Sequence, residues 1–283
     1  MDTHLKTILF TSLIILCSAC QDVIDLPVQS GPERLVVEAS LDWEKGTPGN
    51  QQTIKLSTST GFYEPADLRP VTGAVVRVTN DATGATFDFV DQNNGEYTTT
   101  VFEPVLDQSY SLEIVYGDEV YSARETMVGV ADIDGVYQGR DEGFDDELLE
   151  VHLEFTDPPQ QGNNYLFRFY RVGDLLPYLE YFEDEFFNGN QVDFWHEIDE
   201  DDDLDIEPYM PGDVVEVEMY GISRDYYDFI KVIIDQLRGG GPFSATPVGV
   251  RGNCINETDP QNYAYGYFRL AQKVSARYTF TED

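Results

Sequence analysis

The chain has 283 residues, of which 41% are hydrophobic and 13% aromatic, enough apolar material for the cores of one large or two ordinary domains. This composition excludes a disordered acidic tail. The charge is strongly unbalanced, because 17 Lys and Arg stand against 53 Asp and Glu and give a formal net charge of −36. We therefore expect no nucleic-acid partner, since phosphates would repel such a chain, and the same repulsion disfavours lying flat on an anionic membrane.

The N-terminus has the pattern of a signal peptide. Lys6 is followed by an apolar run at residues 7–16, TILFTSLIIL. This run is too short to cross a bilayer, which takes roughly 20 residues, but it suits the apolar part of a signal peptide. Ser18 and Ala19 then precede Cys20. Small residues directly before a cysteine resemble a bacterial lipobox, in which that cysteine receives the lipid.

We predict that residues 1–19 are a lipoprotein signal peptide and that Cys20 becomes the lipidated first residue of the mature protein. Cys17 departs from the lipobox pattern, which usually has Leu at that position. A redox or zinc pair of Cys17 and Cys20 has the C-x-x-C spacing but lacks a βαβ context or a second pair of ligands. Two or three acyl chains anchor stably, so residues 20–33 would tether a folded body to the outer membrane.

The tether is acidic directly after the acceptor cysteine. Asp22 and Asp25 resemble the export signals of Bacteroidota surface lipoproteins, which favours a protein facing the cell exterior. After removal of the signal peptide, Cys254 is the one ordinary thiol in the mature sequence. No intramolecular disulfide is then expected.

Residues 34–128 are predicted to form short strands separated by turns. Strand-like runs occur at 34–43, 51–62, 73–81, 85–92, 95–101 and 109–127. Alternation is clearest where one face would carry Tyr110, Leu112, Ile114 and Tyr116. Gly117 and Asp118 separate two β-rich runs and predict a tight hairpin. Seven or so strands without a helical pattern indicate an immunoglobulin- or transthyretin-like β-sandwich.

Residues 129–283 predict a second β-rich domain with one packed α-helix. Strands are expected at 148–155, 164–172, 213–220 and 262–280. The helix is expected at 223–238, with Ser223 as its N-cap and with Arg238 and Gly239 at its end. Its apolar face should consist of Tyr226, Ile230, Ile233 and Leu237. The predicted fold class is thus mainly β, a sandwich followed by this second domain.

Several segments resemble a known family in their order along the chain. They are VIDL at 23–26, GAVVRVTN at 73–80, GEYTT at 95–99, FTDPPQQGNNYLFRFYR at 155–171, FNG at 187–189, ISRDYYDFIKVI at 222–233 and PFSATPVGVRGNCINETDPQNYAYGYF at 242–268. Together with the lipobox, they make the chain similar to the Bacteroidota outer-membrane lipoproteins of domain-of-unknown-function family 4249. The resemblance covers nearly the whole mature chain.

The family has no assigned chemistry. Its setting is similar to that of lipoproteins paired with TonB-dependent outer-membrane transporters, so the resemblance implies a non-enzymatic accessory or ligand-binding partner of a nutrient transporter. Other members tend to have Ile where this chain has Cys254, which implies a small buried hydrophobe at that position. Two alternatives stay open, a surface glycan- or peptide-degrading enzyme and a structural or adhesion module.

Aromatic and acidic residues interleave at residues 178–208. Aromatic faces flanked by carboxylates can stack on sugar rings or hold a cationic group. The ligand-binding candidates are therefore Tyr181, Phe182, Phe186, Phe187, Phe194 and Trp195. The alternative is that these rings pack in a core or between domains, as aromatic residues in β domains often do.

The same stretch contains an alternating acidic run. Hard cations prefer several carboxylate oxygens, so this run predicts an irregular Ca²⁺ site. Its ligands would be Asp199, Asp201, Asp203 and Asp205. An EF-hand is excluded, because Leu204 and Met210 stand where such a loop needs Gly and Glu. The alternative is a solvated acidic loop.

We expect no enzymatic activity and no cofactor other than Ca²⁺. His4 would leave with the signal peptide, and His152 lies in an alternating strand, where a structural role is expected. The sequence contains no zinc-protease, nucleophile-elbow, Walker or dinucleotide-binding motif. A carboxylate pair for glycoside hydrolysis stays open, since a chain with 53 acids has many pairs by chance.

Overall fold

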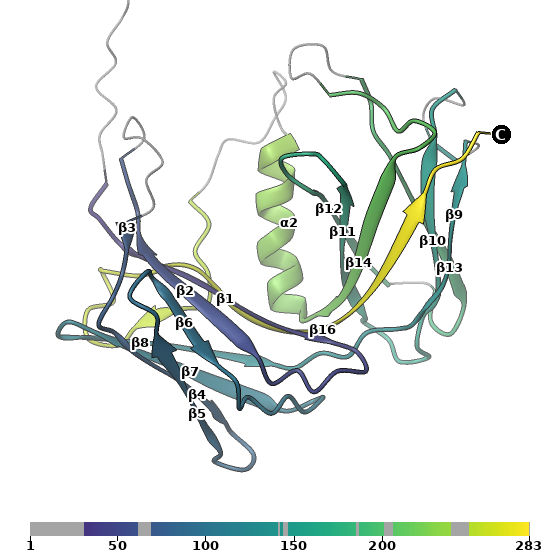
Figure 1. Cartoon of the computed structure of the whole chain (residues 1–283). Helices are drawn as coiled ribbons and strands as arrows, with labels where there is room; N and C mark the ends of the chain where they lie inside the picture. The colour runs from purple at the N-terminus through teal and green to yellow at the C-terminus, as the bar shows by residue number, and fades with distance from the viewer. Residues whose placement is uncertain are drawn as a thin grey trace, which may run out of the picture. The chain divides into compact units, whose positions relative to one another are not determined.

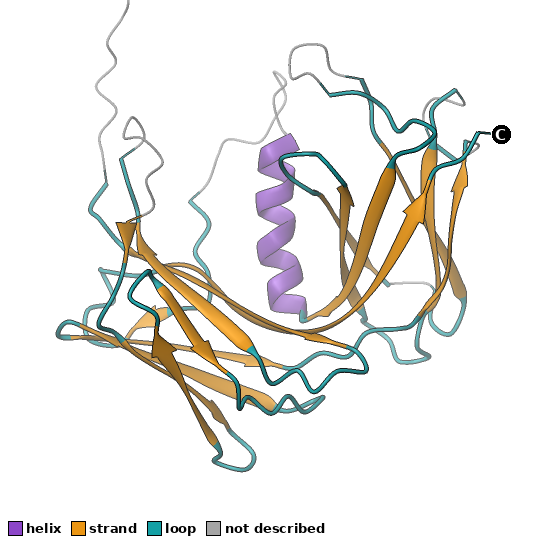
Figure 2. Ribbon diagram, viewed as in Figure 1, coloured by secondary structure: helices purple, strands orange, loops and turns teal. Residues whose placement is uncertain are grey.

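The computed structural model describes residues 31–61, 69–140, 142–143, 147–184, 187–200, 206–238 and 249–282. Within them the protein is mainly β with one α-helix, which confirms the predicted fold class (Figures 1 and 2). Residues Glu33–Thr60 and Pro65–Asp283 form one compact unit. Cys20 and its lipobox lie outside the described residues, so lipidation stays a prediction.

Eight strands come from the first half of the chain. They are β1 (Leu35–Glu44), β2 (Gln52–Thr58), β3 (Arg69–Pro70), β4 (Val75–Asn80), β5 (Thr86–Asp91), β6 (Glu96–Thr99), β7 (Ser109–Tyr116) and β8 (Glu119–Thr126). The alternation in β7 buries Tyr110, Leu112 and Ile114, as predicted. Gly117 adopts a φ of 59° in the turn between β7 and β8, which confirms the hairpin.

The second half supplies the remaining elements. They are β9 (Ile133–Gly139), β10 (Glu150–Thr156), β11 (Asn164–Arg171), β12 (Tyr178–Glu183), β13 (Gln191–Glu197), β14 (Val214–Ile222), α2 (Arg224–Arg238), β15 (Ile255–Asn256) and β16 (Tyr265–Thr279). The strands predicted in this half are present as β10, β11, β14 and β16. Strands β9, β12, β13 and the two-residue β15 had no predicted counterpart.

Most strands belong to one long sheet, in the order β12-β11-β14-β16-β1-β2-β6-β5-β4-β7-β8-β15, with β3 paired to β2. The second sheet has the order β13-β10-β9. The 15-residue strand β16 connects the two halves of the chain, because it pairs parallel to β1 and antiparallel to β14. The proposed domain boundary between residues 128 and 129 stays a prediction.

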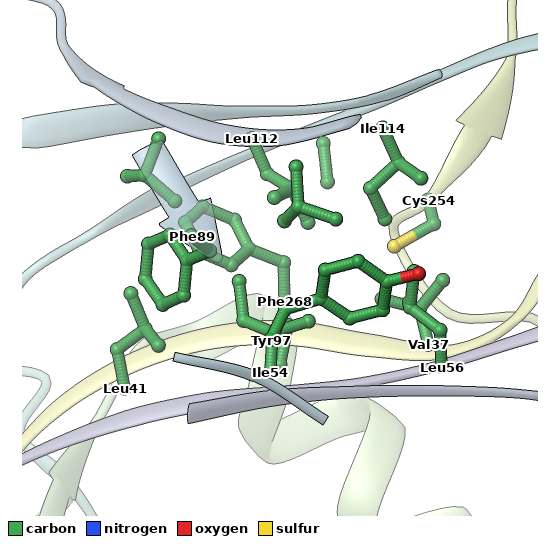
Figure 3. Packing of buried hydrophobic residues seen from close by; sticks show 14 of the residues in the cluster. Val37, Leu41, Ile54, Leu56, Phe89, Tyr97, Leu112, Ile114, Cys254 and Phe268 are labelled. Carbon is green, nitrogen blue, oxygen red and sulfur yellow. The ribbon is translucent and has the colours of Figure 1, made fainter. Parts of the chain in front are cut away.

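The first apolar cluster is enclosed by the sheet as it folds over itself. In Figure 3, Val37 of β1 and Leu56 of β2 face Leu112 and Ile114 of β7. The arrangement is sandwich-like and draws its side chains from strands before residue 128 and from β16. Cys254 packs in this cluster at 4% exposure, and burial raises the pKa of its thiol to about 12. The expectation of a small buried hydrophobe is confirmed.

The second apolar cluster lies between the three-stranded sheet and strands β11, β14 and the end of β16. Its rings include Phe155, Phe167 and Phe169, each fully buried. Strand β16 serves both clusters from one face. Phe268 belongs to the first cluster, and Val274 packs against the second.

The helix covers the opposite face of β11, β14 and β16 (Figure 1). Ser223 caps it, since its Oγ accepts a hydrogen bond from the Tyr226 amide at 3.2 Å. The buried face is Tyr226, Tyr227, Ile230 and Ile234. The prediction of Leu237 on this face is wrong. Leu237 is 79% exposed, and the last turn contacts β12 through the next residue, Arg238.

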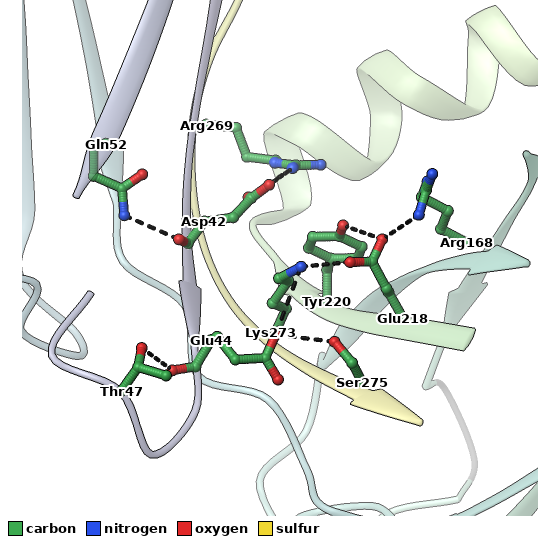
Figure 4. Close-up of polar contacts among 10 residues, drawn as sticks. All are labelled: Asp42, Glu44, Thr47, Gln52, Arg168, Glu218, Tyr220, Arg269, Lys273 and Ser275. Atoms are coloured by element: carbon green, nitrogen blue, oxygen red, sulfur yellow. Dashed lines mark hydrogen bonds and ion pairs between the residues drawn. The ribbon is translucent and has the colours of Figure 1, made fainter. Parts of the chain in front are cut away.

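A buried ion pair ties β1 to β16 beneath the helix (Figure 4). Arg269 is 6% exposed, and its Nη2 donates to both oxygens of Asp42 at 2.6 and 2.7 Å. Its guanidinium also lies 4.8 and 5.0 Å from the ring centres of Tyr220 and Tyr226. Burial opposes the charge, but Asp42 and the two tyrosines outweigh it and raise the pKa of Arg269.

Among the described residues, no helix combines the length and the apolar character that crossing a bilayer requires.

Candidate functional site

A hollow of about 580 Å³ opens beside strands β12 and β13 and the end of α2. It is lined by Glu180, Asp193, Phe194, Trp195, His196, Glu197, Asp199 and Arg238. Strands β12 and β13 each stand at the end of a sheet, so their outer edges lack a strand partner within the described part of the chain. Arg238 bonds the backbone oxygen of Leu179 at 2.8 Å and pairs with Glu180, which joins the helix to β12.

The side chains of β13 alternate between the core and the outer surface. Phe194 and His196 point into the second cluster, where their rings lie 4.3 Å from Phe167 and 4.6 Å from Phe169. Trp195 lies between them in the strand and stays half-buried. The hollow therefore offers an indole on a strand that is held firmly by the packing of its neighbours.

The hollow is acidic, with four carboxylates and one guanidinium in its wall. Burial raises the pKa of Glu180, while Arg238 lowers it by a smaller amount. Burial and the charge of Arg238 lower the pKa of His196 to about 3, so this ring is neutral at physiological pH. Its Nδ1 lies 3.2 Å from the Tyr209 hydroxyl. This wall favours a cationic or hydroxyl-rich ligand rather than an anion.

A partly buried network of hydrogen bonds extends from the hollow across the outer face of the three-stranded sheet, with His152 and Glu150 buried and Asp193 and Tyr137 exposed. His152 is 3% exposed, with Nδ1 3.0 Å from an oxygen of Asp193 and Nε2 2.8 Å from an oxygen of Glu150. Tyr137 stacks on His152 at 4.5 Å and donates a 2.5 Å hydrogen bond to Asp193. Glu150 is fully buried and accepts a 2.6 Å hydrogen bond from the Gly143 amide.

The structure brings together part of the predicted ligand-binding set. Phe194 and Trp195 line the hollow. Tyr181 lies on the other face of β12, where its hydroxyl donates to Asp235 at 2.8 Å. Phe182 packs in the second cluster, and Phe187 is 43% exposed beside it, with the two ring centres 5.9 Å apart. Phe186 lies outside the described residues.

The structure describes only one of the four predicted calcium ligands. Asp199 lines the hollow, while Asp201, Asp203 and Asp205 lie outside the described residues. Within the described ranges, no three His, Cys, Asp or Glu side chains gather in a way that could hold a metal ion. A calcium site formed by the whole acidic run stays a prediction.

Several lining residues were not singled out as site residues by sequence reasoning. Glu180, Asp193, His196 and Glu197 belong to strands that the sequence analysis did not identify. The signal was present in QVDFWHE, where Val192, Phe194 and His196 alternate with polar neighbours. Arg238 was recognised as a helix-ending cation. Its contact with β12 depends on tertiary packing.

Comparison with known proteins gives one family and no curated relative. The model of the family described as "Domain of unknown function (DUF4249)" matches residues 21–277. A comparison with curated proteins gives no match.

Two solved structures show a weak likeness. A cytokine receptor complex is 10% identical with a TM-score of 0.27, and the match covers 68% of this chain and 85% of that one. A segment of two fibronectin type III domains from chicken tenascin is 9% identical with a TM-score of 0.21, covering 60% of this chain and 83% of that one. At these scores the likeness carries no argument.

Proposed function

From the premise that this chain belongs to the DUF4249 family, we propose that it is a lipid-anchored outer-membrane protein of the Bacteroidota, facing the cell exterior. It acts without catalysis as a ligand-binding accessory of a TonB-dependent nutrient transporter. The lipobox at Cys20 and the acidic residues Asp22 and Asp25 support the anchor and its exposure. The transporter partnership rests on the family resemblance.

The hollow beside β12 and β13 is the observation that carries the ligand-binding part of the proposal. It combines the indole of Trp195 with carboxylates of Asp193 and Glu197 on rigid strands. An aromatic face with hydrogen-bond acceptors around it suits a saccharide or a cationic peptide segment. The neutral His196 offers no proton exchange near pH 7, which favours binding over acid–base catalysis.

Lipidation is tested on the full chain expressed in a bacterium with the lipoprotein pathway. We expect Cys20→Ala to abolish acyl labelling and to release the protein from the outer-membrane fraction. The matched variant Cys17→Ala should keep both. Retention of the label in Cys20→Ala would place the lipid elsewhere and contradict the anchor.

The transporter partnership is tested by pull-down of the native lipoprotein from detergent-solubilised outer membranes. Reproducible co-purification of a TonB-dependent barrel is the expected result. Reproducible absence of any barrel, with the lipoprotein itself recovered intact, would contradict this part of the proposal alone.

Ligand binding is followed by the fluorescence of the two tryptophans, Trp43 and Trp195. The variant Trp43→Phe keeps only Trp195, which lines the hollow. The variant Trp195→Phe keeps only Trp43, which is not part of its wall. Titration with neutral oligosaccharides and with cationic peptides should change the emission of Trp43→Phe and leave that of Trp195→Phe unchanged. An equal response of the two variants, or no response to either class, contradicts binding at this hollow.

A further inference from the structure

Two arginines and one lysine, Lys231, have no ion pair among the described residues of this acidic chain. The arginines, Arg34 and Arg251, differ from Lys231 because both contact the same tyrosine ring. Most described Lys and Arg side chains form ion pairs, even where both partners are exposed, as in Arg77 with Asp88. Arg34 and Arg251 have no carboxylate within 4 Å among the described residues. With 53 acids in the chain, an unpaired arginine is a local exception.

Both arginines stack on the same ring. The guanidinium carbon of Arg34 lies 3.7 Å from the centre of the Tyr263 ring, and that of Arg251 lies 3.8 Å from it. One ring face has room for a single guanidinium at such a distance, so the two groups lie on opposite faces of Tyr263. A hydrogen bond with Tyr265 lowers the pKa of Tyr263, and both arginines lower it further.

The first arginine is held rigidly. Its Nη1 donates to the backbone oxygens of Gln261 at 2.9 Å and Tyr263 at 3.3 Å. Its backbone is fastened to Ser59 at the end of β2 by two hydrogen bonds, of 2.9 and 3.0 Å. A guanidinium has five N–H donors, so Arg34 keeps donors beyond those of Nη1, and Arg251 is exposed. Such donors suit the oxygens of a phosphate.

The position of Arg34 in the chain indicates that the phosphate belongs to a lipid head group. Arg34 is the residue that follows the predicted tether, and it stands only 14 positions after Cys20. A chain of that length spans at most about 50 Å when fully extended, which keeps this end of the body near the membrane that holds the acyl chains. The neighbouring Glu33 is paired with Arg69 at 2.9 Å, which reduces its repulsion of an anion.

We propose that Arg34 and Arg251, on the two faces of Tyr263, bind phosphate groups of lipid head groups and turn this end of the acidic body towards the anchoring membrane. The inference rests on the lipid anchor proposed above. It goes beyond that anchor in giving the body an orientation. The remaining surface, with its large negative charge, is kept away from the anionic bilayer by repulsion.

The test uses the lipidated mature protein, which begins at Cys20, reconstituted into vesicles containing phosphatidylglycerol. Its other native cysteine, Cys254, is buried and should not take up the label. A fluorophore is placed at Gln261→Cys, beside the arginines, or at Thr83→Cys, in the exposed turn between β4 and β5. Energy transfer to a labelled lipid head group should be stronger from position 261 than from position 83. Vesicles of phosphatidylcholine alone should reduce this preference, and so should high salt.

Two double variants distinguish the contribution of Arg34 and Arg251 to the orientation from that of the lipid tether. The orientation of the body is expressed as the ratio of molecules with the arginines facing the membrane to molecules with them facing away, obtained from the energy transfer at positions 261 and 83. The double change Arg34→Gln with Arg251→Gln should lower this ratio about five-fold for each arginine removed, because one basic residue near an anionic surface contributes an effect of this size. The matched change Arg77→Gln with Arg277→Gln removes the same charge from exposed, paired positions and should leave the ratio unchanged. An equal effect of the two double variants, or none from the first, overturns the proposal.

Two further outcomes have distinct meanings. Failure of the protein to remain on any vesicle contradicts the anchor, and thus the proposed function, before orientation is measured. Calorimetric binding of inorganic phosphate that is lost in the Arg34/Arg251 variant, without any orientation on vesicles, overturns the lipid assignment in favour of soluble phosphate.

Discussion

The two faces of strand β16 differ although they share one backbone. Phe268 and Leu270 point into the first apolar cluster. Tyr267 and Arg269, on the alternate residues, point towards the helix and meet Glu125 and Asp42. One face is stabilised by the removal of apolar area from water, and the other depends on partners for groups that are costly to bury alone.

The two faces should respond differently to single substitutions. On the apolar face, a smaller side chain costs the contacts that it loses. On the polar face, loss of one partner leaves the other buried without compensation, which costs more than the pair itself is worth.

The ion pair below the helix should show the largest effect. Asp42→Ala leaves the guanidinium of Arg269 buried without its carboxylate. We expect the free energy of unfolding to fall by about 3 to 5 kcal/mol, measured by urea denaturation. The exposed pair of Arg77 and Asp88 is the control, and Asp88→Ala should cost less than about 1 kcal/mol. Equal losses in the two variants would remove the contrast between buried and exposed pairs.

Insertion of a polar group into the apolar face should have the next largest effect. Cys254→Ser places a hydroxyl among the side chains of the first cluster, whereas Cys254→Ala only removes the sulfur. The serine variant should be less stable than the alanine variant by about 1 to 2 kcal/mol in thermal or urea unfolding. A serine variant as stable as the alanine variant would show that the hydroxyl finds a partner there.

The helix cap should contribute less. Ser223→Ala removes the acceptor of the Tyr226 amide and the donor that bonds Glu125 at 2.9 Å. The expected loss is about 1 kcal/mol of unfolding free energy. Ser275→Ala, which removes one exposed hydrogen bond to Glu44, serves as the control and should be close to neutral. A cap variant that matches this control would mean that α2 is held by its apolar face alone.

The smallest effect is a pH dependence on the polar face. Burial raises the pKa of Glu125, although hydrogen bonds from Thr126, Ser223 and Tyr267 lower it in part. The folded state therefore binds this proton more tightly than the unfolded state. Its favourable contribution is fully present below a pH of about 4.5, the ordinary pKa of a glutamate side chain, and is lost as the pH rises through the raised pKa of Glu125.

The measurement is the unfolding free energy of Glu125→Gln as a function of pH. Relative to the native chain, this variant should gain stability as the pH rises from about 4.5. The exposed Glu113→Gln in β7 is the control and should follow the native curve. A Glu125→Gln curve parallel to the native one would show that the burial of Glu125 is offset in the folded state.

Local patterns in the sequence were sufficient for much of the fold. Alternation identified β7, the Gly117–Asp118 pair identified the hairpin, and the apolar repeat with Ser223 identified the helix. Each of these signals depends on neighbours within a few residues, because the strand and helix periods are local. The burial of Cys254 was predicted from the family resemblance and is confirmed.

Local sequence patterns were thus enough to predict a mainly β protein with one helix. The membrane location inferred from Cys20 stays a prediction. Tertiary structure alone decided the parallel pairing of β16 with β1 and the hollow where Arg238 meets β12 and β13. Tertiary structure also brought Arg34 and Arg251 to one ring, although more than 200 residues separate them in the chain. The physical reason is that such contacts join distant segments, and no local period records which partner a buried charge or an exposed ring will meet.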